Sequence, residues 1–323
     1  MTSFPSNKIL ISGSFDSFEE LAAITRAWDA DFRQLSGSEM DHRVLQVMMD
    51  GLLMSRARFG CHLNQHGATP RGFRTFALLE ENCLPIYWFG RRVGPEDLLI
   101  FPEHGEIDAI SRPGFCIHTV AIPIDELAGF FDRFGGPDLG RVLGPEDTVI
   151  KLAPDPLRRL RTHLRNVSFD ESLLSRSLAL LDAYRDKLFS LLLEIFRGKA
   201  DPRLLPQYQQ SQARRIRDVA RLIEAHREEP PCIADLCAIT KIPERTLNET
   251  FRRQLGMSPG AFVKGSRLYG AHRDLWHADP SRVRVSDVAN SWGFWHMGQF
   301  AADYRKLFGE MPRTTLKRLP TAG

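Results

Sequence analysis

The chain has 323 residues, of which 43% are hydrophobic and 26% charged. That length exceeds one average domain and is enough to bury sizeable cores, so we expect two domains with an additional helical segment. The sequence predicts neither a membrane-spanning protein nor a secreted one. No run reaches the ~18 apolar residues of a membrane span, and the first residues lack the charged and apolar regions of a signal peptide.

The cysteines and the charge distribution narrow the class further. Five cysteines are an odd number and form no C-x-x-C pair, which predicts reduced thiols in a cytoplasmic protein with no membrane partner. The formal net charge is +3. Residues 213–323 contain 19 Lys and Arg against 12 Asp and Glu, so this end carries +7 and the remainder −4. This asymmetry indicates a polyanionic partner for the C-terminal end.

Residues 1–150 show short apolar runs separated by Gly and Pro, such as "RTFALLEE", "PIYWFG" and "FCIHTVAIP". The pattern predicts a small β barrel or sandwich, entered by one early helix around "SFEELAAITRAW". His62 and His66 lie four residues apart, but in a stretch that is typical of a strand or loop and without nearby carboxylates. We therefore expect no metal there.

Residues 151–198 have leucines at helical spacing, with a break near residues 166–170, and predict a helical hairpin. Its apolar surface exceeds what two helices need for each other, so we expect it to pack on the barrel or on a second subunit, with a role in coupling or dimerisation. Residues 199–212 have few apolar residues and contain two prolines, a composition that predicts a linker.

Residues 213–323 contain an internal duplication. The segment "CIADLCAITKIPERTLNETFRRQLGMSP" has nearly the same plan as "VSDVANSWGFWHMGQFAADYRKLFGEMP", 52 to 53 residues later. Asp235 and Asp287 stand where a short helix begins, and Gly256 and Gly309 stand where a second helix ends. Gly293 can take the left-handed conformation of a tight turn between them. Each unit is therefore predicted to be a helix-turn-helix.

Two such units in one chain have a functional implication. A recognition helix enters the major groove with its N-terminal end, and grooves on one face of B-DNA recur every ~34 Å. A helix over "PGAFVKGSRLYGAHRDLWHAD" between the units would hold two recognition helices for adjacent grooves of double-stranded DNA.

Residues 213–318 resemble the DNA-binding domain of the AraC/XylS family of bacterial transcription regulators. The resemblance is carried by "IADL", "RTLNETFRRQLGMSP", "SRLYGAH", "VSDVANSWGF" and "QFAADYRKLFGEMPRTTLKR". Cys237 stands where the family usually has Ala, and Pro243 stands where the family has Ser at the start of its first recognition helix. Proline is tolerated in a first helical turn, so the fold is unaffected and only the capping differs.

Exposed positions of the two recognition helices are the candidate DNA contacts. Arg245 suits guanine, Asn248 adenine and Glu249 the amino group of cytosine. We expect the first helix to give most of the sequence discrimination and the second to position the domain. The complete candidate set is Arg245, Asn248, Glu249, Arg252, Trp295, His296, Met297, Gln299, Arg305 and Lys306, with Arg313, Lys317 and Arg318 as further phosphate contacts.

The N-terminal region is the candidate effector domain. The stretch "GATPRGFRTFALLEENCLPIYWFG" and the residues after it resemble ethanolamine-responsive members of the same family, which implies a cupin-like sensor barrel. Four arginines with a nearby tryptophan would line a pocket for an anionic or aromatic effector, or would form a solvated rim. These candidates are Arg71, Arg74, Trp88, Arg91 and Arg92.

The predicted function is a ligand-responsive, sequence-specific transcriptional regulator, an activator that contacts RNA polymerase and forms a homodimer. One alternative is control by a cyclic dinucleotide, although the R-x-x-x-R motif of PilZ-type receptors is absent before residue 150. A second is control by a protein partner without a small-molecule effector. A third is a catalytic N-terminal barrel. Because no catalytic, metal or cofactor constellation stands out in the sequence, we expect no enzyme and no cofactor.

Overall fold

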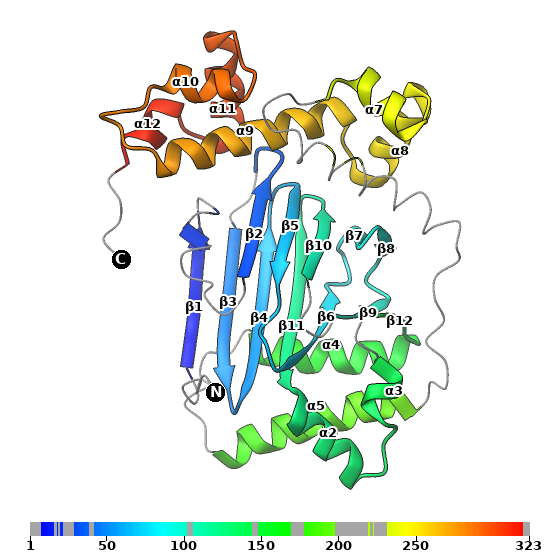
Figure 1. Ribbon diagram of the computed structural model, residues 1–323. Coiled ribbons are helices and arrows are strands. Elements are labelled where there is room, and N and C mark those ends of the chain that lie inside the picture. Colours follow the sequence, from blue (N-terminus) through cyan, green and yellow to red (C-terminus); the bar gives the residue numbers. More distant parts are fainter. Residues whose placement is uncertain are drawn as a thin grey trace.

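The computed structural model describes residues 8–15, 18, 20–21, 29–38, 42–101, 106–143, 148–168, 178–197, 219, 222 and 231–318. The N-terminal part is built from antiparallel strands in two sheets, and the C-terminal part is all helical and lies across one end of those sheets (Figure 1). This arrangement confirms the α+β fold class, with a sandwich-like N-terminal domain, a helical hairpin and two helix-turn-helix motifs.

The larger sheet has the strand order β1-β3-β4-β11-β6-β9-β12, and the smaller sheet has the order β2-β5-β10-β7-β8. The bounds of the first sheet's strands are Lys8–Phe15, His42–Met49, Leu52–Phe59, Phe115–Pro123, Phe73–Leu79, Asp97–Ile100 and Thr148–Lys151 in that order. Those of the second are Asp29–Gln34, Leu63–Ala68, Glu106–Ser111, Ile86–Trp88 and Arg91–Val93.

The larger sheet is buried on both faces, which explains why its strands have almost continuous apolar runs. Along β6, Phe76 and Leu78 belong to a core beneath the helices, while Ala77 and Leu79 belong to a second core between the sheets. Successive side chains of a strand point to opposite faces, so both sets need apolar residues. Alternation of apolar and polar residues is therefore a weak predictor of the strands in this sheet.

Helices α2 (Ile124–Arg133), α4 (Pro154–Ser168) and α5 (Leu178–Arg197) cover the outer face of the larger sheet (Figure 1). A short helix, α3 (Leu139–Leu143), follows α2. Leu157, Leu160 and Leu164 of α4 are buried together with Leu188 and Leu192 of α5 and the sheet residues beneath them. The hairpin thus packs on the sheet, one of the two alternatives expected from its leucine surface. Its role in dimerisation stays a prediction.

The hairpin contains a histidine that makes it sensitive to acid. The imidazole of His163 stacks on Tyr184 with ring centroids 3.9 Å apart, and its Nε2 lies 3.0 Å from the Tyr184 carbonyl oxygen. Burial lowers the pKa of His163 from 6.5 to about 4. The unfolded chain therefore takes up this proton at a higher pH than the folded chain, and stability is lost as the pH falls from 6.5 towards 4.

Between pH 7 and pH 5 this proton is expected to lower the free energy of unfolding by about 2 kcal/mol. Urea unfolding of the wild type and of His163→Phe at both pH values measures the effect. Phenylalanine keeps the stacking on Tyr184 but does not titrate, so the variant should lose about 2 kcal/mol less than the wild type. An equal loss in both proteins would contradict this account of the hairpin.

The C-terminal part consists of α7 (Ile233–Thr240), α8 (Glu244–Leu255), α9 (Pro259–His277), α10 (Val285–Ser291), α11 (Met297–Phe308) and α12 (Pro312–Leu316). It has two separate cores, and α9 contributes to both. Phe262 and Val263 pack in the core around α7 and α8, whereas Leu268, Ala271 and Leu275 pack in the core around α10 and α11. One continuous helix therefore joins two independently packed units.

Two expected segments lie largely or wholly outside the described residues. Of the early helix, only Phe18, Glu20 and Leu21 are described, and all three are helical. The linker over residues 199–212 lies entirely outside them.

Candidate nucleic-acid interface and effector cavity

The first helix-turn-helix is formed by α7 and α8. The Cys232 backbone amide donates to Asp235 Oδ2 at 2.8 Å, which closes the N-terminal end of α7. Lys241 adopts a left-handed φ of 55° at the turn, and Ile242 is buried between the helices. Gly256 ends α8 with a φ of 75°, a conformation that glycine adopts without a steric cost.

The second unit, formed by α10 and α11, has the same construction. The Arg284 backbone amide donates to Asp287 Oδ2 at 3.3 Å, and Gly293 has a φ of 71° at the turn. Trp292 is buried, and its Nε1 donates to Asp274 Oδ2 at 2.7 Å. Gly309 ends α11 with a φ of 77°. Most of the aromatic bulk in this stretch is therefore core, as its helical spacing indicates.

Two prolines follow the glycines that end the recognition helices. Pro259 is the first residue of α9, and Pro312 is the first residue of α12. A proline fits there because its missing N–H would be unpaired in any first turn.

Helix α8 presents a polar face to solvent at the positions chosen as base contacts. Leu247 and Phe251 are buried, whereas the Arg245 side chain is 90% exposed. Arg245 Nε donates to Glu249 Oε1 at 2.9 Å, a surface ion pair of the kind that contributes little to stability and can open on binding. Asn248 is half-buried, and its amide donates to the Glu244 carbonyl oxygen at 3.1 Å. Glu249 and Arg252 are exposed.

Helix α11 presents a different surface. Trp295 is 73% exposed, so it stands outside the core that contains Trp292. His296 precedes the helix and is exposed, as is Gln299, whose side chain hydrogen-bonds Asp303. Met297 packs partly against the core of this unit.

Basic side chains also reach solvent near the C-terminal end of the second unit. Arg305 and Lys306 on α11 are exposed, as are Arg313 and Lys317 further along. Arg318 lies with its guanidinium 4.8 Å from the Trp276 ring centroid and pairs with Glu310.

The C-terminal ends of both recognition helices contact the N-terminal domain. Arg112, which follows β10, donates through Nε to the Gln254 carbonyl oxygen at 3.0 Å, and His62 Nε2 lies 2.9 Å from the Leu255 carbonyl oxygen. Gln34 at the end of β2 donates to the Leu307 carbonyl oxygen of α11 at 2.9 Å. A cation at the end of α8 also complements the negative end of the helix dipole.

Apolar contacts extend this interface. Leu35, Tyr87 and Ile110 of the N-terminal domain belong to the same buried cluster as Leu247 and Phe251. Burial lowers the pKa of His62, which favours the neutral ring between Ser36 and Leu255. Sequence reasoning missed this interface, because Gln34, His62 and Arg112 form no motif and lie far apart in the chain.

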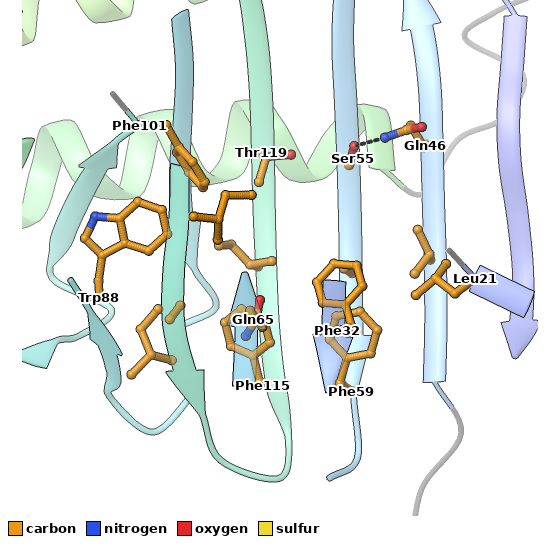
Figure 2. A pocket seen from close by; sticks show the side chains of 16 residues that line it. Leu21, Phe32, Gln46, Ser55, Phe59, Gln65, Trp88, Phe101, Phe115 and Thr119 are labelled. Atoms are coloured by element: carbon orange, nitrogen blue, oxygen red, sulfur yellow. Dashed lines mark hydrogen bonds between the residues drawn. The ribbon is translucent and has the colours of Figure 1, made fainter. Parts of the chain in front are cut away.

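A cavity lies between the two sheets (Figure 2). It has a volume of about 90 Å³. The smaller sheet contributes Phe32, Gln65, Ile86, Trp88, Ile107 and Ala109, and the larger sheet contributes Val44, Gln46, Ser55, Ala57, Phe59, Phe115, Ile117 and Thr119, with Leu21 and Phe101 from adjoining segments. No side chain that carries a formal charge is among these lining residues.

The expected effector residues divide into two groups. Trp88 lines the cavity, whereas the four arginines are not among its lining residues. Their assignment to an effector site stays a prediction. Arg74 is buried elsewhere, and its Nη2 donates to the Leu143 carbonyl oxygen at 3.1 Å. Arg71 lies in the exposed turn before β6, and Arg91 and Arg92 lie on β8. The sequence does not show which side chains of the larger sheet face the cavity, because apolar residues occupy both faces of that sheet.

The described residues contain no group of three or more His, Cys, Asp or Glu side chains placed to hold a metal. No helix in that part of the chain is long and apolar enough to cross a membrane.

Comparison with known proteins adds the family. Residues 236–318 match the model of a helix-turn-helix domain. A probable thc operon regulatory protein of Rhodococcus erythropolis is 35% identical over 98 residues, which are 30% of each chain. A XylDLEGF operon transcriptional activator of Pseudomonas putida is 30% identical over 102 residues, 31% of each chain.

Among solved structures, a probable AraC family transcriptional regulator from Rhodopseudomonas palustris is 42% identical, with a TM-score of 0.30, over 32% of this chain and 95% of its own. The helix-turn-helix region of the chain is of the AraC/XylS type, as its motifs predicted. The match spans only about 30% of the length of the curated relatives.

Proposed function

We propose that this protein is a ligand-responsive transcriptional regulator that reads two adjacent major grooves with α8 and α11. The observation that carries the proposal is the pair of helix-turn-helix units on one continuous helix, each with an exposed N-terminal end on its second helix. The 19 residues of α9 give it a length of about 28 Å, of the order of the ~34 Å groove repeat.

The proposed base contacts are Arg245, Asn248, Glu249 and Arg252 on α8, and Trp295, His296, Met297 and Gln299 on α11. Arg305 and Lys306 are the proposed phosphate contacts. Of the α11 set, His296 and Gln299 offer hydrogen bonds, so we assign most of the discrimination to α8. Activation through RNA polymerase and a homodimer on paired sites complete the proposal. The name of the Pseudomonas putida relative supports the activator reading.

The proposed effector site is the cavity between the sheets. Strand β2 places Phe32 in its wall and Gln34 against α11, and β10 places Ala109 in its wall and Ile110 against the α8 unit. A ligand that shifts these strands would therefore act directly on the ends of both recognition helices. This physical route favours small-molecule control over control by a protein partner alone.

The proposal predicts how Arg245 contributes to selectivity. Sequences selected by the full-length chain from a random library are titrated across a salt series with the wild type, Arg245→Ala and the control Arg282→Ala. Arg245→Ala should cost about 1–3 kcal/mol and relax the preference at one base position, because a bidentate guanine contact is lost.

Arg282 is matched as an exposed arginine with a surface partner, Asp279, but lies outside both recognition helices. Its replacement should leave every base preference unchanged. Binding that depends on salt alone, with no base preference in any of the three proteins, would argue against a sequence-specific regulator.

A further inference from the structure

The cavity wall contains a row of polar side chains whose position follows from strand register. Gln46 on β3 is paired with Ser55 on β4, and Ser55 is paired with Thr119 on β11. Paired residues in neighbouring strands point to the same face of a sheet, so the three side chains lie side by side. The neighbouring row, Val44, Ala57 and Ile117, is apolar and lines the same cavity.

This polar row has unused hydrogen-bonding capacity. Gln46 Nε2 donates to Ser55 Oγ at 3.0 Å, whereas Thr119 Oγ is buried and has no partner. Thr119 is 7% exposed, and Figure 2 shows its hydroxyl directed towards the side where Ser55 lies. Buried hydroxyl groups in folded proteins are nearly always paired, so an unpaired one in a cavity wall indicates a partner that enters the cavity.

The opposite wall is mainly apolar. Phe32, Gln65, Ala109 and Trp88 are in register across the smaller sheet, and the Gln65 amide is already paired with Ser111. On the larger sheet, beside the polar row, Phe59 and Phe115 stack with centroids 6.1 Å apart. Such a wall suits a planar ring, which stacks or packs edge-on against aromatic side chains. An engineered apolar cavity of about 150 Å³ binds benzene, so a cavity of about 90 Å³ limits the ligand to roughly one ring.

The charge of the ligand is also restricted. Since no charged side chain is among the described residues that line the cavity, an ionised carboxylate or phosphate inside it would have no counter-ion from that part of the chain. A neutral hydroxyl or carbonyl group is compatible with the same wall, because Thr119 and Ser55 can donate to it or accept from it.

We propose that the cavity binds a compact, uncharged, mainly apolar ligand of about one ring, whose single hydroxyl or carbonyl group hydrogen-bonds Thr119 in the polar row. This inference deepens the effector role given under Proposed function and rests on it only for its regulatory consequence. Of the anionic or aromatic effector expected from the sequence, it keeps the aromatic alternative.

Titration calorimetry of the full-length protein at pH 7 with benzyl alcohol, toluene and benzoate tests the inference. These probes share a ring and differ in the polar group. Benzyl alcohol should bind about tenfold more tightly than toluene, and benzoate should not bind measurably. Thr119→Val, which replaces the hydroxyl by a methyl group of similar size, should reduce the affinity for benzyl alcohol to that for toluene and leave toluene binding unchanged.

A second variant, Ala109→Leu, fills the cavity from the opposite wall and should abolish binding of both neutral probes. Thermal unfolding of each variant shows whether it is folded. Benzoate binding as tight as that of benzyl alcohol, or no binding of any probe by the folded wild type, would overturn the inference. So would an equal loss for both neutral probes in Thr119→Val.

The DNA-binding assay separates this inference from the proposed function. The expected ligand pattern without any change in DNA affinity would support the cavity assignment and contradict its effector role.

Discussion

Replacing Gly270 with valine is expected to abolish high-affinity DNA binding while the N-terminal domain stays folded. Gly270 lies where α9 crosses α10, and a Cβ atom there would stand 2.1 Å from the Trp292 ring. The ring has no room to turn away, because it is buried and its Nε1 is held by Asp274. Overpacking of this kind costs about 1–3 kcal/mol or more, which is large for one small helical unit.

Gly260→Ala is the matched control on the same helix. A Cβ atom at Gly260 would lie 3.7 Å from Ile233, an ordinary contact, so this change should leave binding intact and stabilise α9 by about 0.5–1 kcal/mol. Thermal unfolding and titration with a selected operator measure both variants. Operator binding by Gly270→Val within twofold of the wild type would contradict the role of the α10–α11 unit.

Replacing Gly265 with valine is expected to open the interface between the two domains. A Cβ atom at Gly265 would lie 2.4 Å from the Leu35 carbonyl oxygen, a backbone atom that cannot move aside as a flexible side chain can. The hydrogen bonds from Gln34, His62 and Arg112 to the two recognition helices would be lost with it. Part of the core of the α7–α8 unit would also become exposed.

Small-angle scattering should show a larger radius of gyration for Gly265→Val, and unfolding should separate into two transitions. Operator affinity should fall at least tenfold, because the ends of α8 and α11 lose their common support. Gly129→Val on α2 is the control, since nothing lies within 4 Å of a Cβ atom at that position. Unchanged scattering together with a single transition would show that the domains are not held together at this contact.

The features predicted best from the sequence are those that depend on residues close together in the chain. Asp235 and Asp287 at helix starts, and Gly256, Gly293 and Gly309 at left-handed positions, lie where their local chemistry requires. The duplication of these signals predicted both helix-turn-helix units, and their motifs predicted the AraC/XylS type of this region. Trp295, a candidate DNA contact from the sequence, is 73% exposed, whereas Trp292 is buried.

The cavity and the interdomain interface could not be predicted, because both depend on contacts between distant residues. Gln46, Ser55 and Thr119 become neighbours only through the register of three strands. Arg112 has a role only once α8 lies beside it. Arg74, assigned to the pocket on the basis of its charge, is instead buried against Leu143, since its strand turns it away from the cavity.

The most direct test of two-groove recognition changes the spacing within the operator. Footprinting on a selected sequence, with Arg245→Ala and His296→Ala, assigns the base positions near each recognition helix. Affinity is then measured for the same operator with 5 base pairs inserted between those positions, which rotates one groove by about half a turn. We predict at least a tenfold loss, because α9 holds α8 and α11 on one face of the DNA. Unchanged affinity after the insertion would contradict joint recognition by the two units.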